Sequence, residues 1–113
     1  MSHMIIWINK DDTIDEEKLW NYEATPDKIM EKTGRSIILN YDETHIIKVA
    51  MNVMTELNEI DSIVKFQGHP NIIKLHCIMC SEKLNNSLKI IHPKDRFCCY
   101  AMLMERGIIL NRK

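Results

Sequence analysis

The sequence lacks the features that mark several large classes of protein. It has no apolar run approaching the roughly 18 residues that a membrane-spanning helix requires, and the apolar stretch at residues 4–8 is too short for a secretory signal. The formal net charge of −1 provides no electrostatic footprint for nucleic acid or for an anionic membrane. The four cysteines show no spaced disulfide framework, which predicts reduced thiols and an intracellular, cytoplasmic location.

The composition is that of an ordinary globular domain. At 113 residues, with 45% hydrophobic and 27% charged residues, the chain is expected to form a single domain with its own core. It is rich in Ile, Asn, Lys and Met, a bias that suits an AT-rich genome such as that of a large DNA virus or an intracellular parasite. The sequence contains no internal repeat and no low-complexity segment.

Apolar segments separated by turn signals predict a mixture of strands and helices. Thr13 and Glu16 have capping-box spacing, which predicts the start of a short helix, and Gly68 and Pro70 end a longer one. Strands are expected at residues 5–8, 28–33, 37–39, 45–50, 72–80 and 97–105. The polar segment 81–95 is expected to be a mobile loop.

The longer helix, expected over residues 51–66, carries two adjacent stripes of side chains. The first stripe is apolar and consists of Val53, Leu57, Ile60 and Val64. The second stripe lies beside it and consists of Glu56, Glu59 and Ile63. We expect the first stripe to pack on the sheet and the second to have no cover within this chain.

Four features follow one another between residues 45 and 107. They are a strand containing Lys48, a helix bearing Glu59, the turn Gly68-His69-Pro70-Asn71, and the sequence Met102-Leu103-Met104-Glu105. This order resembles the small N-terminal lobe of protein kinases, and the resemblance covers roughly residues 29–107. It implies an α+β fold, with a curved, mostly antiparallel five-stranded sheet packed on one main helix. Residues 1–27 then form an N-terminal extension with a short strand and a short helix, and residues 28–113 form the lobe, which ends at the hinge.

The resemblance also implies a vestigial nucleotide cleft. In kinases a lysine on the third strand binds the α- and β-phosphates, and a helix glutamate holds that lysine in place. Lys48 and Glu59 match these two positions. Met104 matches the residue that gates the adenine pocket, and Glu105 and Gly107 are implied to lie beside the adenine ring.

Departures from the kinase pattern argue against catalysis. A glycine-rich loop needs several glycines to approach phosphates closely, and Gly34 is alone in that region. Ile46 stands where kinases usually have an alanine above the adenine, and its extra volume crowds that pocket. The catalytic aspartate and asparagine and the metal-binding aspartate of the second lobe have no counterpart here. We therefore expect no catalytic residue, no metal and no cofactor, with ATP binding weak or absent.

These observations predict a non-catalytic kinase N-lobe-like binding module, a decoy or regulator of a protein kinase in a viral or parasite setting. Its expected partner is another kinase or kinase-like chain, or a second copy of itself. The expected contact residues are Glu56 on the second helix stripe, with Ile63 and Leu75, which match apolar spine positions of the family. Two alternatives stay open: an N-terminal fragment of a complete ATP-dependent Ser/Thr protein kinase, and a small α+β interaction protein with an accidental resemblance.

Plainer interpretations of the same residues also stay open. Lys48 and Glu59 can form a structural ion pair that contributes little to stability. Met104 can be a packing residue in an Ile- and Met-rich sheet.

A zinc site built from cysteines is a further alternative. The sequence His76-Cys77 with Cys80, together with Cys98 and Cys99, offers enough soft ligands for zinc. Because side chains alternate along strands, Cys98 and Cys99 are expected to point to opposite faces, and Cys77 and Cys80 also diverge. We expect buried free thiols instead.

Overall fold

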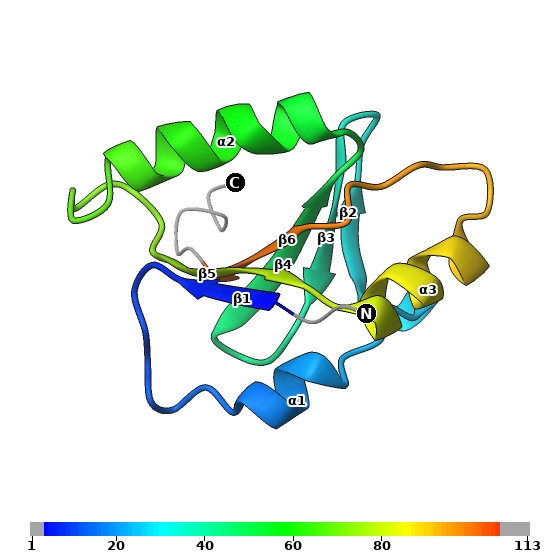
Figure 1. The fold of residues 1–113 in the computed structure, drawn as a ribbon, viewed down its shortest axis with the longest axis horizontal. Helices are drawn as coiled ribbons and strands as arrows, with labels where there is room; N and C mark the ends of the chain where they lie inside the picture. The colour runs from blue at the N-terminus through cyan, green and yellow to red at the C-terminus, as the bar shows by residue number, and fades with distance from the viewer. Residues whose placement is uncertain (1–3, 107–113) are drawn as a thin grey trace.

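Six antiparallel strands form a single sheet in the computed structural model, which describes residues 4–106 (Figure 1). In chain order they are β1 (Met4–Trp7), β2 (Ile29–Lys32), β3 (Ser36–Asn40), β4 (His45–Ala50), β5 (Leu75–Cys80) and β6 (Ala101–Glu105). Across the sheet they follow the order β1-β5-β6-β4-β3-β2. The α+β class and the antiparallel pairing are confirmed. The predicted count of five strands is wrong, because β1 pairs with β5 as an edge strand, with Ile5 opposite Met79.

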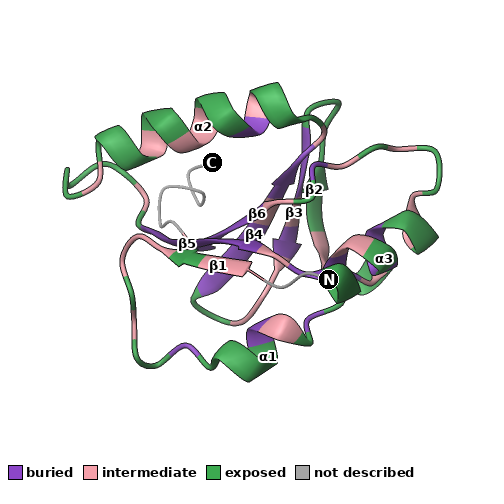
Figure 2. Ribbon diagram, in the orientation of Figure 1, coloured by how far each residue is buried: buried purple, intermediate pink, exposed green. Residues whose placement is uncertain are grey.

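The sheet separates two cores. The larger core lies between the sheet and two helices, α1 (Glu16–Trp20) and α3 (Glu82–Ile91), and the smaller core lies between the sheet and α2 (Val53–Lys65). Figure 1 shows α2 on one side of the sheet and α1 and α3 on the other, and Figure 2 shows buried residues concentrated in the central strands. A short 3-10 helix, η1 (Pro26–Lys28), leads into β2. None of the helices within residues 4–106 has the length and hydrophobicity needed to cross a membrane.

The central strand β4 carries apolar side chains on both faces because both faces are covered. Ile47 and Val49 belong to the larger core, whereas Ile46 belongs to the smaller one. This is the alternation expected of a strand, since successive side chains point to opposite faces. A strand covered on both faces appears in sequence as a nearly continuous apolar run.

Helix α3 occupies most of the segment that was predicted to be a mobile loop, so that prediction is wrong. Ser81 caps the helix, and its hydroxyl oxygen accepts a hydrogen bond from the Leu84 amide at 3.3 Å. Leu84 and Leu88 are fully buried in the larger core, and Ile91 packs against it. These three positions follow steps of four and three residues, but the stripe is narrow and lies among polar residues, which is why the segment resembled a loop.

The N-cap of helix α1 lies two residues after the predicted cap, Thr13. The N-cap is Asp15, whose carboxylate accepts hydrogen bonds from the amides of Glu17 at 2.9 Å and Lys18 at 3.5 Å. Thr13, the predicted cap, instead donates its hydroxyl to Asp11 at 2.7 Å. The predicted cap is therefore wrong, although an aspartate satisfies the free amides of a helix start as well as a threonine does.

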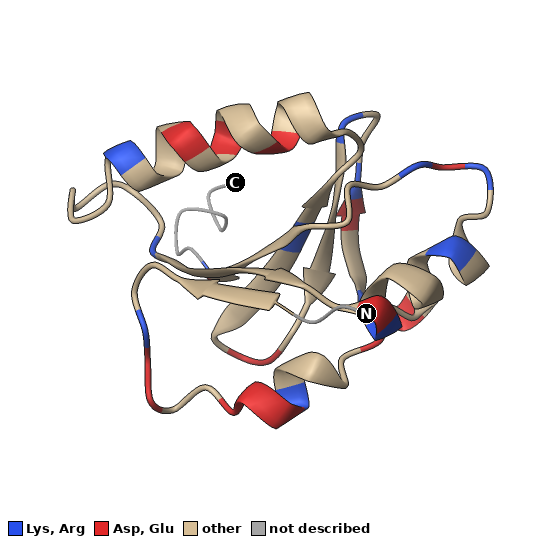
Figure 3. Cartoon of the chain, in the orientation of Figure 1, with Lys and Arg blue, Asp and Glu red and all other residues tan. Residues whose placement is uncertain are grey.

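Helix α2 matches the predicted range closely, but it is turned about its axis relative to the prediction, so that Glu56 and Ile63 face the sheet together with Ile60. Its first turn is acidic and its last turn contains Lys65 (Figure 3), an order that suits the helix dipole. Glu56 is 1% exposed and faces the sheet, and Ile63 packs against the smaller core. Val53, Leu57 and Val64 of the predicted core stripe are exposed, Leu57 by 54%. The reason for this orientation is hydrogen bonding, because Glu56 and Glu59 of α2 accept hydrogen bonds from residues of β4.

We expect Leu88→Ala to lower the free energy of unfolding by about 2–5 kcal/mol, because it leaves a cavity where a fully buried side chain packs. Urea unfolding followed by circular dichroism measures the change. The matched control is Ile90→Ala on the same helix, since Ile90 is 77% exposed; it should change the free energy by less than about 0.5 kcal/mol. Small and equal effects of both substitutions would contradict the packing of α3.

Candidate functional site

Lys48 and Glu59 meet between β4 and α2. The Lys48 ammonium donates a hydrogen bond to Glu59 Oε2 at 2.7 Å, and the two side chains are 21% and 32% exposed. These are the two residues that the sequence singled out as a lysine–glutamate pair. An ion pair that is partly open to solvent contributes modestly to stability. The pair also connects α2 to the sheet, because Lys48 lies on the central strand β4 and Glu59 lies in the middle of α2.

Glu56 lies one turn before Glu59 on the sheet-facing side of α2. Its Oε1 accepts a hydrogen bond from the Ala50 amide at 3.3 Å, and its Oε2 has no hydrogen-bond partner among the described residues. Burial raises the pKa of Glu56 to about 7, and the nearby charge of Glu59 acts in the same direction. The Ala50 hydrogen bond and the charge of Lys48 oppose that shift. Near neutral pH this side chain can therefore hold or release a proton.

The sheet face that α2 covers is apolar next to these polar groups. Ile46 on β4 and Met104 on β6 are register partners, and both are buried in the smaller core with Leu75. They are the two residues that the kinase resemblance placed around an adenine ring. In the structure both side chains belong to the smaller core, against which Ile60 and Ile63 of α2 also pack.

Glu105, another predicted cleft residue, does not join this group. Glu105 is exposed at the end of β6, opposite His45 of β4. Gly107 lies outside the described residues. The structure therefore brings together Lys48, Glu59, Ile46 and Met104, and leaves Glu105 at the strand end.

The predicted partner-binding residues do not form an uncovered surface. Glu56 and Leu75 are fully buried, and Ile63 is half-buried against the smaller core. The expectation that they lack cover within the chain is wrong, because α2 is turned so that this stripe faces the sheet. The apolar side chains left in solvent include Val53, Leu57 and Val64 of the adjacent stripe.

The cysteines match the expectation of buried free thiols only in part. Within residues 4–106 all four are unpaired; Cys77 and Cys98 are buried, whereas Cys80 is half-buried and Cys99 is exposed. Burial raises the pKa of the Cys77 thiol to about 12, so this sulfur stays protonated. A cysteine binds zinc as the thiolate, so Cys77 is poorly suited to that role.

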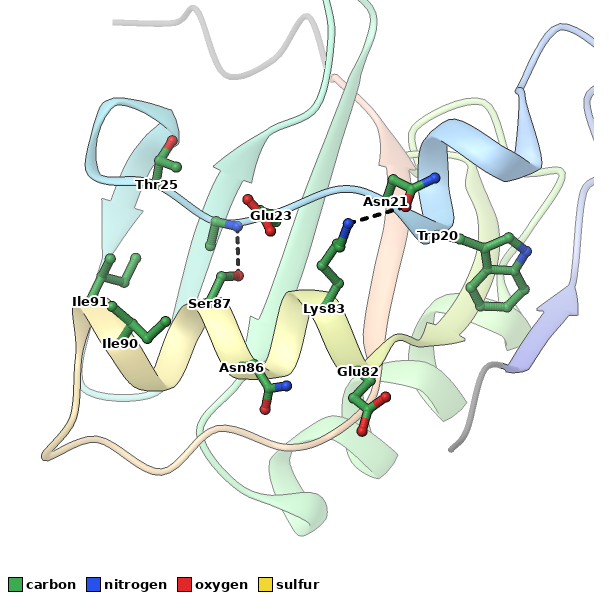
Figure 4. A pocket seen from close by; sticks show the side chains of 11 residues that line it. Trp20, Asn21, Glu23, Thr25, Glu82, Lys83, Asn86, Ser87, Ile90 and Ile91 are labelled. Carbon is green, nitrogen blue, oxygen red and sulfur yellow. Dashed lines mark hydrogen bonds between the residues drawn. The ribbon is translucent and has the colours of Figure 1, made fainter.

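A surface groove of about 620 Å³ separates the segment from Trp20 to Thr25 from α3 (Figure 4). Two hydrogen bonds cross it: the Ala24 amide donates to Ser87 Oγ at 2.8 Å, and Lys83 Nζ donates to Asn21 Oδ1 at 3.3 Å. These polar groups hold the two segments together. We assign the groove a structural role.

A second group of polar side chains was not foreseen from the sequence. Asp11 lies after β1, His45 begins β4 and His76 lies in β5, and one potential ligand atom of each lies within 4.8 Å of the others. These three residues are far apart in the chain, so no short sequence motif indicates that they lie together. Only the assembled sheet brings them together.

Comparison of the chain with family models, with curated proteins and with solved structures finds no match. The geometry of the chain itself is therefore the basis for the functional argument.

We expect Glu56→Gln to stabilise the domain more at about pH 8 than at about pH 4.5. The folded-state pKa of about 7 exceeds the ordinary value of 4.5, so between these two values the folded state holds a proton that the unfolded state has lost. The contribution of Glu56 to stability is therefore complete below the ordinary value and disappears as the pH rises through 7. Glutamine keeps the shape and carries no charge.

The free energy of unfolding from urea titrations at the two pH values measures this effect. The difference between variant and native chains should grow by on the order of 1–3 kcal/mol from the lower to the higher pH. An identical difference at both pH values would contradict a raised pKa of Glu56 in the folded state.

Proposed function

We propose that the chain is a non-catalytic protein-binding module of the kinase small-lobe type, and that it docks on its partner through the outward side of α2. The observation that carries the proposal is the orientation of α2, which buries Glu56, turns Glu59 toward Lys48 of the sheet and leaves an apolar surface in water. The proposed partner is a protein kinase or kinase-like chain, a second copy of this chain included.

Three features support the small-lobe part of the proposal. A strand with a lysine, a helix with a glutamate and two further strands follow one another in the chain. The lysine and the glutamate are in contact at 2.7 Å, the pairing that active kinases use to position the phosphate-binding lysine. The single helix α2 packs on one face of the antiparallel sheet. Strand β1 and helices α1 and α3 are additions to that plan.

The same region supports the non-catalytic part. Ile46 and Met104 fill the sheet face below α2 with buried apolar atoms. The turn between β2 and β3 contains Gly34 alone, so it lacks the run of glycines that lets amides approach phosphates. Phosphoryl transfer requires a metal, a base and positioned phosphates together, and the polar groups under α2 are one lysine and two glutamates.

The proposed docking surface, called here the outer face of α2, consists of exposed large apolar side chains on α2 and just after it. They are Val53, Met54, Leu57, Val64 and Phe66. Domains that function alone rarely leave a contiguous apolar patch in water, and such patches usually mark interaction sites. Burying it against a protein yields about 25 cal/mol per Å² before the cost of association.

We expect Leu57→Asp to abolish association while the fold survives, because it places a charge in the middle of the outer face of α2. Light scattering on the purified chain at low micromolar concentration measures self-association, and binding to an immobilised kinase domain measures the other case. Ser62→Asp is the matched control: it adds the same charge to an exposed polar position of α2 and should leave association unchanged.

Ile63→Asp separates this surface from the core. Ile63 packs against the smaller core, so this variant should lose several kcal/mol of stability, as buried charges do. If Leu57→Asp unfolds the chain and Ile63→Asp does not, α2 is oriented as the sequence first suggested. A native chain that stays monomeric and binds no kinase domain would remove the support for the proposal.

We expect Mg-ATP at millimolar concentration to raise the melting temperature little, because stabilisation by a ligand grows with its concentration relative to its dissociation constant. Thermal unfolding with and without nucleotide measures the shift. Lys48→Met is the matched comparison: any small shift that depends on phosphate contact should disappear in it. A clear shift at micromolar ATP that Lys48→Met removes would favour a nucleotide-binding enzyme fragment instead.

A further inference from the structure

Asp11, His45 and His76 meet on the larger-core side of the sheet, away from α2. We propose that they bind one divalent transition-metal ion, with zinc as the best match, through a carboxylate oxygen of Asp11 and the Nε2 atoms of both histidines. Such an ion would fasten the loop after β1 to the ends of β4 and β5. The inference does not depend on the proposed docking surface.

The three groups are placed closely enough to close around an ion. One ligand atom of each lies within 4.8 Å of the others, and the two imidazole rings are 5.0 Å apart between centroids. Ligands at the usual zinc distances stand about 3.4 Å apart in a tetrahedron. Movement of about an ångström, available to Asp11 on its loop, completes the arrangement.

His76 is the observation that points to a ligand. It is 1% exposed, and its Nδ1 lies 3.0 Å from the carbonyl oxygen of Asn9. A carbonyl only accepts, so Nδ1 carries the proton and Nε2 presents a lone pair. That Nε2 is buried and has no hydrogen-bond partner among the described residues. Buried polar atoms are almost always paired, and a metal ion would satisfy this one.

His45 is held in the same way. Its Nδ1 lies 3.0 Å from Asp42 Oδ1 and 2.9 Å from the Thr44 hydroxyl. A carboxylate that accepts from Nδ1 leaves Nε2 free as a ligand, and it also orients the ring. Metal-binding histidines commonly show this arrangement, in which the second nitrogen donates to a carboxylate or a backbone carbonyl.

Asp11 supplies the negative charge. One of its oxygens, Oδ1, accepts hydrogen bonds from the Thr13 amide at 3.0 Å and from the Thr13 hydroxyl at 2.7 Å. These bonds orient the carboxylate and leave Oδ2 for a metal. Two imidazoles and one carboxylate suit a transition metal better than magnesium or calcium, which prefer oxygen ligands alone. Three protein ligands leave one tetrahedral position for water.

Titration of chelator-treated protein with Zn²⁺, in competition with a chromogenic chelator, tests the proposal. We expect one ion per chain and a higher melting temperature with zinc than without. Asp11→Asn and His45→Gln should each weaken binding by at least tenfold. His76 is left unchanged in this test, because it is the most deeply buried of the three ligands and its substitution would disturb the fold most.

Two controls separate this site from other zinc ligands. His69→Gln removes an exposed histidine elsewhere, and the double substitution Cys80→Ser with Cys99→Ser removes the two more accessible thiols; both should bind as the native chain does. With Co²⁺ as the probe, the spectrum should show no sulfur-to-cobalt charge-transfer band. Failure to bind Zn²⁺, affinity unchanged in Asp11→Asn and His45→Gln, or binding lost with the cysteines would overturn the proposal.

Discussion

The orientation of α2 depends on two carboxylates that find their donors on β4. Glu56 accepts from the Ala50 amide, and Glu59 accepts from the Lys48 ammonium. An amphipathic helix packed by its apolar stripe alone would turn Leu57 toward the sheet. With the glutamates inward, α2 instead covers the sheet with Ile60 and Ile63 and leaves Leu57 in solvent.

This arrangement places two unfavourable features on one helix. A buried glutamate with an unpartnered oxygen and an exposed apolar stripe on one helix both cost free energy. Natural sequences depart from simple patterning mainly at functional or strained sites. That is the physical reason for placing the proposed docking surface on α2, rather than in the groove beside α3, whose polar groups already hydrogen-bond across it.

The other face of the sheet shows how topology can gather polar groups. Strand β6 lies between β4 and β5, yet the rings of His45 and His76 reach one another across it. Strand β1 pairs with β5 and carries the following loop, with Asp11, to the same place. The Nδ1 of each histidine lies within hydrogen-bond distance of an oxygen, so the Nε2 of each remains available as a ligand.

Much of the local structure could be predicted from the sequence. The predicted strand 45–50 matches β4, the helix 51–66 contains α2, and the N-terminal strand 5–8 overlaps β1. Lys48 and Glu59 were predicted as a pair and are in contact. These successes rest on short-range signals: apolar runs, three- and four-residue steps, and Gly or Pro at the ends. Helix α3 was missed because its apolar stripe is only two leucines and an isoleucine, and these are stabilised by packing on the sheet, which a local pattern does not show.

The sequence by itself determined where most elements lie and which side chains share a face of each. Only the tertiary structure decided which face of α2 is covered, since two adjacent stripes compete for the sheet and hydrogen bonds to β4 settle the competition. It also decided that β1 joins the sheet and that Asp11, His45 and His76 meet. The reason is range: periodicity within an element records its faces, whereas the choice between faces depends on donors and surfaces supplied by distant parts of the chain.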